Sequence, residues 1–406
     1  MLEHKGHDVS SLRKHSAAGY TGDPKTAASA CTSFGSPCVR VSFCLEAPPA
    51  ASRMFFDLEQ KDVDASMFVA AAHGDSVLIK MEYYDEHNAD DALDYFVYNA
   101  GDAARPPSLT LLPHNYVDAT EQDEPNPDMD VRATGILRRG DDELVVAELI
   151  TKGSDDDMLP PNEAKLLLLR SGEWSLKRAP IIHGDDGGGK GAELSAWETD
   201  MVVPVGDRRL CWVDLHRGVM LCDPFDESPR LHRGTTTCDH SLNAFIITTW
   251  TLMIDGDGDT SSWTMDAMID ATELWSLDAY AKARLPRVLP EFPVAGMDDS
   301  PHHVTFVVRH PRRHEDDSDI TSLIKLDTRR KTLLSLCRYY ERQPGRPSCS
   351  RTFYHPSSIS DHLKLLPSSS NGLRMRMDFE DLDRRSSSSD EPSAKRLKMS
   401  SSEVCC

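Results

Sequence analysis

The stretch "RLCWVDLHRGVMLCDP", residues Arg209–Pro224, decides how the chain is interpreted. Two apolar runs flank a short turn at residues 216–218, and the runs end at Asp214 and Asp223. An aspartate that follows a strand usually accepts hydrogen bonds within a turn, whereas a pair of catalytic carboxylates would have to converge in a cleft. We therefore interpret the stretch as a β-hairpin of a repeating unit, in which the two aspartates close turns.

A Gly-Asp pair between two apolar runs recurs along the chain. It occurs in "AAHGDSVLI", "LRRGDDELVV", "VPVGDRRLCW" and, more loosely, "IDGDGDTSSW", with its glycine at Gly74, Gly140, Gly206 and Gly258. The glycines are spaced 66, 66 and 52 residues apart. Glycine tolerates the positive φ of tight turns, so each pair predicts a hairpin. We expect the first three glycines to occupy equivalent points of successive sheets.

A second element repeats at a similar distance, an apolar run closed by a polar residue. These runs end at Asn99, Arg170, Asp223, Asp278 and Asp327. Four strands in a unit of about 50 residues are typical of a propeller blade, and stacked blades bury both faces of each sheet. The run "LCWVDL" is apolar at both alternate positions, so we expect Trp212 to be buried between sheets.

The predicted fold is all-β, a propeller-like array of about five to six four-stranded antiparallel blades. Strands near 38–57 are candidates to complete the ring. A pair of β-sandwiches or another stacked-sheet fold is the alternative. Composition divides the chain into a disordered N-terminal tail at 1–37, a body at 38–367 with an acidic loop at 118–130, and a disordered, Ser-rich tail at 368–406.

The charge, the apolar runs and the cysteines of the chain restrict the classes of partner and the cellular location that we expect. The formal net charge of -21 argues against nucleic acid and anionic membranes as partners, although a basic local patch could bind an acidic partner. The longest apolar run has 13 residues, too few to span a bilayer. None of the ten cysteines forms a CxxC pair, and Cys211 and Cys222 lie in apolar runs, where thiols serve as small buried hydrophobes. We expect a soluble protein of the nucleus, the cytoplasm or both.

Three stretches partly match ligand-binding motifs. The loop "GDDGGGKGA" at 184–192 lacks the hydroxyl residue of a phosphate loop. The stretch "DGDGDTSSWTMD" at 255–266 lacks the sixth-position glycine of a calcium loop. Four histidines at 302, 303, 310 and 314 are split by a strand-like run, and adjacent side chains on a strand point to opposite faces. We expect no catalytic, cofactor-binding or metal-binding residues and no cofactor.

Several segments closely resemble a plant, chiefly grass, family called domain of unknown function 1618. They are "LCWVDLHRGVMLCD", "ITTWTL", "ELWSL", "LPRVLPEFPV" and "LDTRRKTLLS". The resemblance covers roughly 38–340 and implies a plant protein, but the family supplies no catalytic residues. The segment after "LCD" is shorter than in most members, so we expect an incomplete blade there. The Gly-Asp pattern is more faintly similar to F-box-associated propellers, but no F-box-like helix precedes it.

The C-terminal stretch "RRSSSSDEPSAKRLKM" contains two basic clusters, like a bipartite nuclear import signal. The clusters comprise Arg384, Arg385, Lys395, Arg396 and Lys398. Between them, Ser387 and Ser388 each have an acidic residue three positions later, the context that acid-directed kinases prefer, so both are candidate phosphorylation sites. A nuclear import carrier is the implied partner, and a merely solubilising tail is the alternative.

These observations predict a non-enzymatic plant scaffold that binds a protein partner through the loop faces of a propeller. One alternative is a small-ligand-binding or catalytic propeller with its site in the central channel. Another is an F-box-related adaptor that lacks its F-box. No converging nucleophile, base and orienting group is visible in the sequence, and this favours the scaffold.

Overall fold

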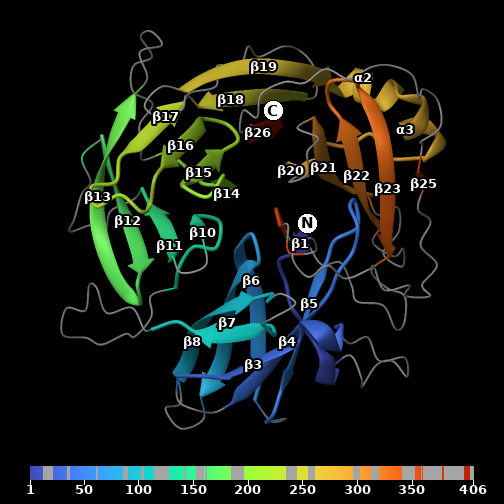
Figure 1. The fold of residues 1–406 in the computed structure, drawn as a ribbon. Helices are drawn as coiled ribbons and strands as arrows, with labels where there is room; N and C mark the ends of the chain where they lie inside the picture. Colours follow the sequence, from blue (N-terminus) through green and yellow to red (C-terminus); the bar gives the residue numbers. More distant parts are fainter. Residues whose placement is uncertain are drawn as a thin grey trace.

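A computed structural model describes most of the chain between residues 1 and 357. The described residues are 1–11, 22–33, 37–60, 63–85, 90–101, 105–113, 128–140, 143–151, 160, 162–183, 196–234, 245–254, 261–295, 302–311, 320–340, 353–357, 359, 377–378 and 397–402. Within them, β-strands form six sheets or parts of sheets, here called blades A to F in chain order, that surround a centre (Figure 1).

Three successive blades share one plan, in which four antiparallel strands follow each other in chain order. Blade B comprises β6 (Ala65–His73), β7 (Ser76–Asp85), β8 (Asp90–Asn99) and β9 (Ser108–Leu111). Blade C comprises β10 (Thr134–Arg139), β11 (Glu143–Ile150), β12 (Glu163–Arg170) and β13 (Glu173–His183). Blade D comprises β14 (Met201–Val205), β15 (Arg209–Asp214), β16 (Gly218–Cys222) and β17 (Leu231–Gly234). A parallel pairing of β13 with β17 joins blades C and D at their edges.

The remaining blades vary this plan. Blade A orders its strands as β2 (His7–Asp8), β5 (Arg53–Leu58), β4 (Cys38–Cys44) and β3 (Ala28–Cys31). Blade E comprises β19 (Ser261–Asp270), β18 (Ile246–Ile254) and the remote β26 (Leu397–Ser402). Blade F comprises β20 (Glu291–Ala295), β21 (His303–Arg309), β22 (Ile320–Asp327), β23 (Thr332–Tyr340) and the short β25 (Met377–Asp378). The predicted all-β, propeller-like fold is confirmed, and blade E has three strands in the described residues.

The core lies between the blades because alternate residues of a strand face opposite neighbours. In β15, Leu210 and Trp212 belong to the apolar cluster shared with blade C, while Cys211 and Val213 belong to a second cluster on the other face of blade D. All four side chains are buried. The prediction that Trp212 is buried between sheets is confirmed, and so is the role of Cys211 and Cys222 as buried hydrophobes.

The three Gly-Asp turns are equivalent, as predicted. Gly74, Gly140 and Gly206 each join the first and second strands of blades B, C and D. Their φ values are 58°, 62° and 63°, which glycine adopts without strain. Gly258 lies outside the described residues. The second repeat is also equivalent at four sites, because Asn99, Arg170, Asp223 and Asp327 end or directly follow the third strand of their blades.

The prediction of a strand that ends at Asp278, the fifth member of that repeat, is wrong. Residues around Asp278 form two short helices, α2 (Ala271–Ser276) and α3 (Asp278–Lys282), between blades E and F. Asp270 Oδ1 accepts a hydrogen bond from Glu273 N, and Asp270 N donates one to Glu273 Oε2, so a capping box starts α2. Leu274 and Tyr280 then bury their side chains against blade F. No helix of the described residues is long and apolar enough to cross a membrane.

The N-terminal segment corrects another expectation, that residues 1–37 are disordered. Residues 1–11 and 22–33 include β1 (Leu2–Glu3), β2, a 3-10 helix η1 (Pro24–Thr26) and β3. Strand β1 pairs with β24 (Tyr354–His355), and β2 pairs in parallel with β5. These pairings join segments far apart in sequence, so local composition did not reveal them. In the predicted C-terminal tail, only β25 and β26 lie within the described residues.

Candidate interaction surface

The turns between first and second strands, and between third and fourth strands, lie at one end of blades B, C and D, here called the turn face. The sequence at Asp223 shows how these turns are fixed. Asp223 accepts a hydrogen bond from the backbone of Phe225 at 2.9 Å, and its carbonyl accepts one from Asp226 N at 3.2 Å. Proline is favoured at the second position of such a turn, where Pro224 lies. Local chemistry therefore closes this turn.

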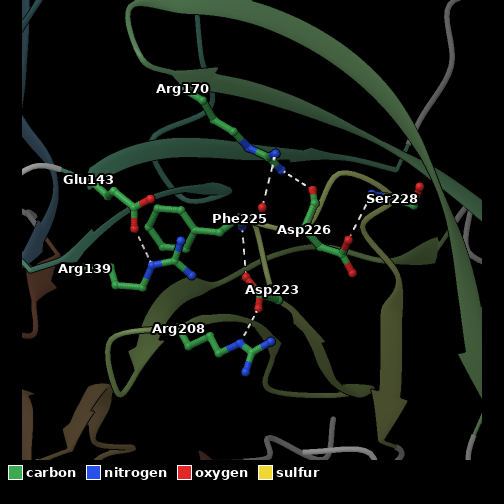
Figure 2. Close-up of polar contacts among 8 residues, drawn as sticks. All are labelled: Arg139, Glu143, Arg170, Arg208, Asp223, Phe225, Asp226 and Ser228. Atoms are coloured by element: carbon green, nitrogen blue, oxygen red, sulfur yellow. Dashed lines mark hydrogen bonds and ion pairs between the residues drawn. The ribbon is translucent and has the colours of Figure 1, made fainter.

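Side chains of blade C hold this blade D turn in place (Figure 2). Arg170 donates hydrogen bonds to the carbonyl oxygens of Phe225, at 3.4 Å, and Asp226, at 2.5 Å. The guanidinium carbon of Arg139 lies 4.1 Å from the centre of the Phe225 ring. Lys177 adds a 2.6 Å hydrogen bond to the carbonyl of Glu227. The turn is thus fastened to the neighbouring blade by cations that contact its backbone and its aromatic ring.

Two ion pairs border the same turn (Figure 2). Arg208 Nε lies 2.6 Å from Asp223 Oδ2, and Arg139 Nε lies 2.5 Å from Glu143 Oε2. The hydrogen bond from Arg139 lowers the pKa of Glu143, and the hydrogen bond to Asp223 raises the pKa of Arg208. Glu143 and Arg208 therefore remain charged at neutral pH. The Arg208 side chain is 68% exposed, so much of it is available to a partner.

Hydrogen bonds of an arginine also connect blades B and C. Arg138 of β10 donates from Nε to Ser76 Oγ at 2.7 Å and from a terminal nitrogen to Asn99 Oδ1 at 2.6 Å. Its backbone N–H donates to His73 Nδ1 at 3.0 Å. Across three blades, the turn face is therefore a fixed frame that presents charged side chains. Such a frame can bind a surface of complementary charge.

Asp214 and Asp223 do not form a carboxylate pair. Asp214 accepts hydrogen bonds from the backbone N–H groups of His216 and Arg217, each at 2.9 Å, at the end of β15. Asp223 follows β16 at the other end of the same hairpin, because Leu210 pairs with Cys222 and Asp214 with Gly218. The predicted turn-closing role of both aspartates is confirmed.

The centre of the ring, the location of the alternative ligand site, contains the N-terminal segment (Figure 1). The His4 ring stacks between Phe68 and Phe353, with centroids 5.2 and 4.0 Å away. Its Nδ1 lies 2.7 Å from the carbonyl oxygen of Val69. His355 Nε2 lies 3.3 Å from the same nitrogen. Burial lowers the pKa of His4 to about 4 and that of His355 to about 3, so both rings are neutral near pH 7.

The other candidate residues are not brought together. His303 Nε2 lies 3.9 Å from Asp327, whereas His310 Nε2 lies 2.9 Å from Ser322 at the other end of β21. His314, the loop at 184–192 and the aspartates at 255, 257 and 259 lie outside the described residues. In the described part of the chain, no three His, Cys, Asp or Glu side chains are arranged to hold a metal ion.

The candidate import and phosphorylation residues are not tested. Arg384, Arg385, Ser387, Ser388, Lys395 and Arg396 lie outside the described residues. Lys398 lies in β26, opposite Thr251 of β18. Both roles stay predictions.

Sequence reasoning missed two features. One is the contact of Arg139 and Arg170 with the 223–228 turn, for which the sequence contains no local signal. The other is a disulfide between Cys31 and Cys38, which are cross-strand partners in β3 and β4. Their spacing of seven residues around a hairpin could have suggested it. Among the described residues, Cys44, Cys211, Cys222 and Cys337 are not part of a disulfide.

Residues 231–305 match the model of a family described as "Protein of unknown function (DUF1618)". Over that segment the chain is similar to the DUF1618 family. The DUF1618 match includes β17 to β20 and both helices, and it confirms the resemblance found in the sequence. No curated protein is significantly similar in sequence to the chain.

Two solved structures align over most of the chain. The WD40 domain of SCAP from fission yeast is 10% identical, with 79% of this chain and 78% of that chain covered and a TM-score of 0.26. The β-propeller domain of Cps50 (Swd1) from Myceliophteria thermophila is 7% identical, with 80% and 95% covered and a TM-score of 0.21. Neither likeness carries an argument about what this protein does.

Proposed function

We propose that the protein is a non-enzymatic scaffold that binds a protein partner through the turn face of blades B to D. The observation that supports this most strongly is the fastening of the 223–228 turn. Arg170, Lys177 and Arg139 of blade C contact its backbone and its aromatic ring, so the turn is held in place before any partner arrives. A pre-ordered surface loses less side-chain and loop entropy on binding.

The charge pattern supports a protein partner rather than a polyanion. Arginines and carboxylates alternate around the turn, and the whole chain carries a net charge of -21. Mixed charges give specificity toward a surface of complementary pattern, whereas a polyanion would be repelled by the overall charge. The plant origin, the nuclear or cytoplasmic location and the import carrier implied by the tail belong to the same proposal.

Charge reversal tests the proposal. The Arg208→Glu variant should weaken partner capture about tenfold or more, equivalent to ~1.4 kcal/mol. It should change the free energy of unfolding by only about 1 kcal/mol or less, because an exposed ion pair contributes little to stability. Affinity capture with quantitative mass spectrometry, alongside thermal melting, measures both effects.

The matched control is His216→Glu, which places the same charge at the opposite end of β15. It should leave the captured proteins unchanged. Equal capture by the Arg208→Glu variant and the wild type would exclude the turn face as the binding surface. A small molecule that copurifies with both would favour the central-site alternative.

A further inference from the structure

In the part of the chain that the structure describes, blade E differs from its neighbours because strand β19 lies at the edge of a three-stranded sheet. Blades B, C, D and F each have four consecutive strands, but among the described residues β19 pairs only with β18. Figure 1 shows β19 on the outer side of the ring, outside β18. An unpaired strand edge presents N–H and C=O groups that can pair with another chain.

Exposed apolar side chains lie on this strand. Four large hydrophobic residues are exposed in the described part of the chain, and two of them are Met265 at 48% and Met268 at 45%. Their cross-strand partners are Trp250 and Thr248, which are two residues apart on β18. Both methionines therefore lie on the same face of the sheet, with the bulge at Asp266 between them. Flexible methionine side chains adapt well to an incoming apolar surface.

The opposite edge of the same sheet shows which kind of strand it accepts. Residues Leu397–Ser402, more than 140 residues downstream, pair antiparallel with β18 as β26. This added strand starts with the sequence Leu-Lys-Met, in which apolar residues alternate with a basic one. Blade E is thus completed on its inner side by a basic, partly apolar strand that does not come from a neighbouring hairpin.

The acidic residues of β19 favour a basic partner segment at the outer edge of blade E as well. Strand β19 contains Asp266 and Asp270 and has no lysine or arginine. A second copy of this chain would bring the same carboxylates and a net charge of -21 to the edge, so it is disfavoured. We propose that the outer edge of β19 binds an extended segment of a partner protein in which apolar residues alternate with basic ones, as a further strand of blade E.

This surface is separate from the turn face, so the two proposals fail independently. Main-chain hydrogen bonds would supply the affinity, and the contact with the two methionines would supply the selectivity. The Arg208→Glu variant should therefore bind the segment normally.

Amide hydrogen exchange of the full-length protein, with and without a ten-residue peptide of alternating lysine and valine, tests the proposal. In the free protein the outward-facing amides of residues 264–268 should exchange rapidly. Saturating peptide should slow these amides at least about tenfold, because each new hydrogen bond protects its donor. A peptide of alternating glutamate and valine should not.

The Met265→Lys/Met268→Lys double variant should lose this protection while it keeps the wild-type melting temperature, because both side chains are exposed. The matched control, Tyr84→Lys, alters an exposed aromatic residue of blade B and should keep it. Slow exchange of these amides before peptide is added would overturn the proposal, since another part of the chain would then cover the edge. No protection by the lysine peptide, or equal protection in the double variant, would also overturn it.

Discussion

Trp212 connects the hairpin of β15 and β16 to blade C through apolar packing and a hydrogen bond. Its ring is fully buried in the cluster between blades C and D, and its Nε1 donates a 2.7 Å hydrogen bond to the carbonyl of Ala133. An indole that is buried with its N–H satisfied contributes a large apolar area without a desolvation cost.

Replacing Trp212 with alanine should lower the free energy of unfolding by about 3–5 kcal/mol, through lost burial and the cavity left behind. Urea denaturation followed by circular dichroism measures the change. The exposed neighbour Arg208, changed to alanine, is the control and should cost about 1 kcal/mol or less. A wild-type denaturation midpoint for the Trp212→Ala variant would show that this core assignment is wrong.

The histidines at the centre make stability depend on pH. In the unfolded chain a histidine binds a proton below about pH 6.5, but burial lowers the pKa of His4 to about 4 in the folded protein. Between these values the unfolded state binds more protons, so stability falls as the pH falls. Lys80 and Arg132 also act on His4, and both lower its pKa further.

The His4→Gln variant should therefore lose part of the decrease in unfolding free energy between pH 6.5 and pH 4. Glu148 acts with the opposite sign, because burial raises the pKa of its carboxyl group to about 7. Comparing the slope of the variant with that of the wild type, by denaturation at several pH values, cancels this contribution. Identical slopes would mean that His4 is not buried as a neutral ring.

At the scale of the elements, glycines set the turns, but for different reasons. Gly140 has a φ of 62° and open space where a Cβ would lie. Gly101 has a φ of 71°, and a Cβ there would lie 2.3 Å from the carbonyl oxygen of Arg105. The first position therefore needs only a residue that tolerates positive φ, whereas the second also has no room for a side chain.

Gly140→Ala should lower the free energy of unfolding by about 1–2 kcal/mol, because a residue with a Cβ is less stable than glycine in the left-handed conformation. Gly101→Ala should lower the free energy of unfolding distinctly more, because the backbone must move to relieve the contact between the new Cβ and the carbonyl oxygen of Arg105. Thermal melting of the two variants checks the order. Equal losses, or a larger loss at Gly140, would contradict the close approach of Gly101 to the carbonyl oxygen of Arg105.

The elements also show what the sequence can predict. The repeats at Gly74, Gly140 and Gly206 located equivalent hairpins because turn chemistry is local. The helices near Asp278 were missed, although the capping residues Asp270 and Glu273 are visible, because the apolar run "ELWSL" fits a strand as well as a helix. Strands β1 and β2 were missed because their partners lie far away in sequence. Likewise, the turn-closing role of Asp223 could be predicted, whereas the contacts from Arg139 and Arg170 depend on how blades stack.

At the scale of the whole molecule, the ring places equivalent turns of several blades at one end. The N-terminal strands then link parts of the chain that are distant in sequence. Gly6 N donates to Met67 O at 2.8 Å in blade B, and Glu3 N donates to Ser52 O at 2.9 Å beside blade A. The N-terminal segment thus occupies part of the centre (Figure 1), and this favours the outer surfaces for binding.

Site-specific photo-crosslinking tests the partner-binding claim most directly. A photoreactive amino acid is placed at position 208, on the turn face, or at position 216, at the other end of β15, and both proteins are illuminated in extract from the source tissue. The account predicts a discrete crosslinked protein with the probe at 208 and none with the probe at 216. The same crosslinked protein from both positions, or a product from position 216 alone, would contradict it.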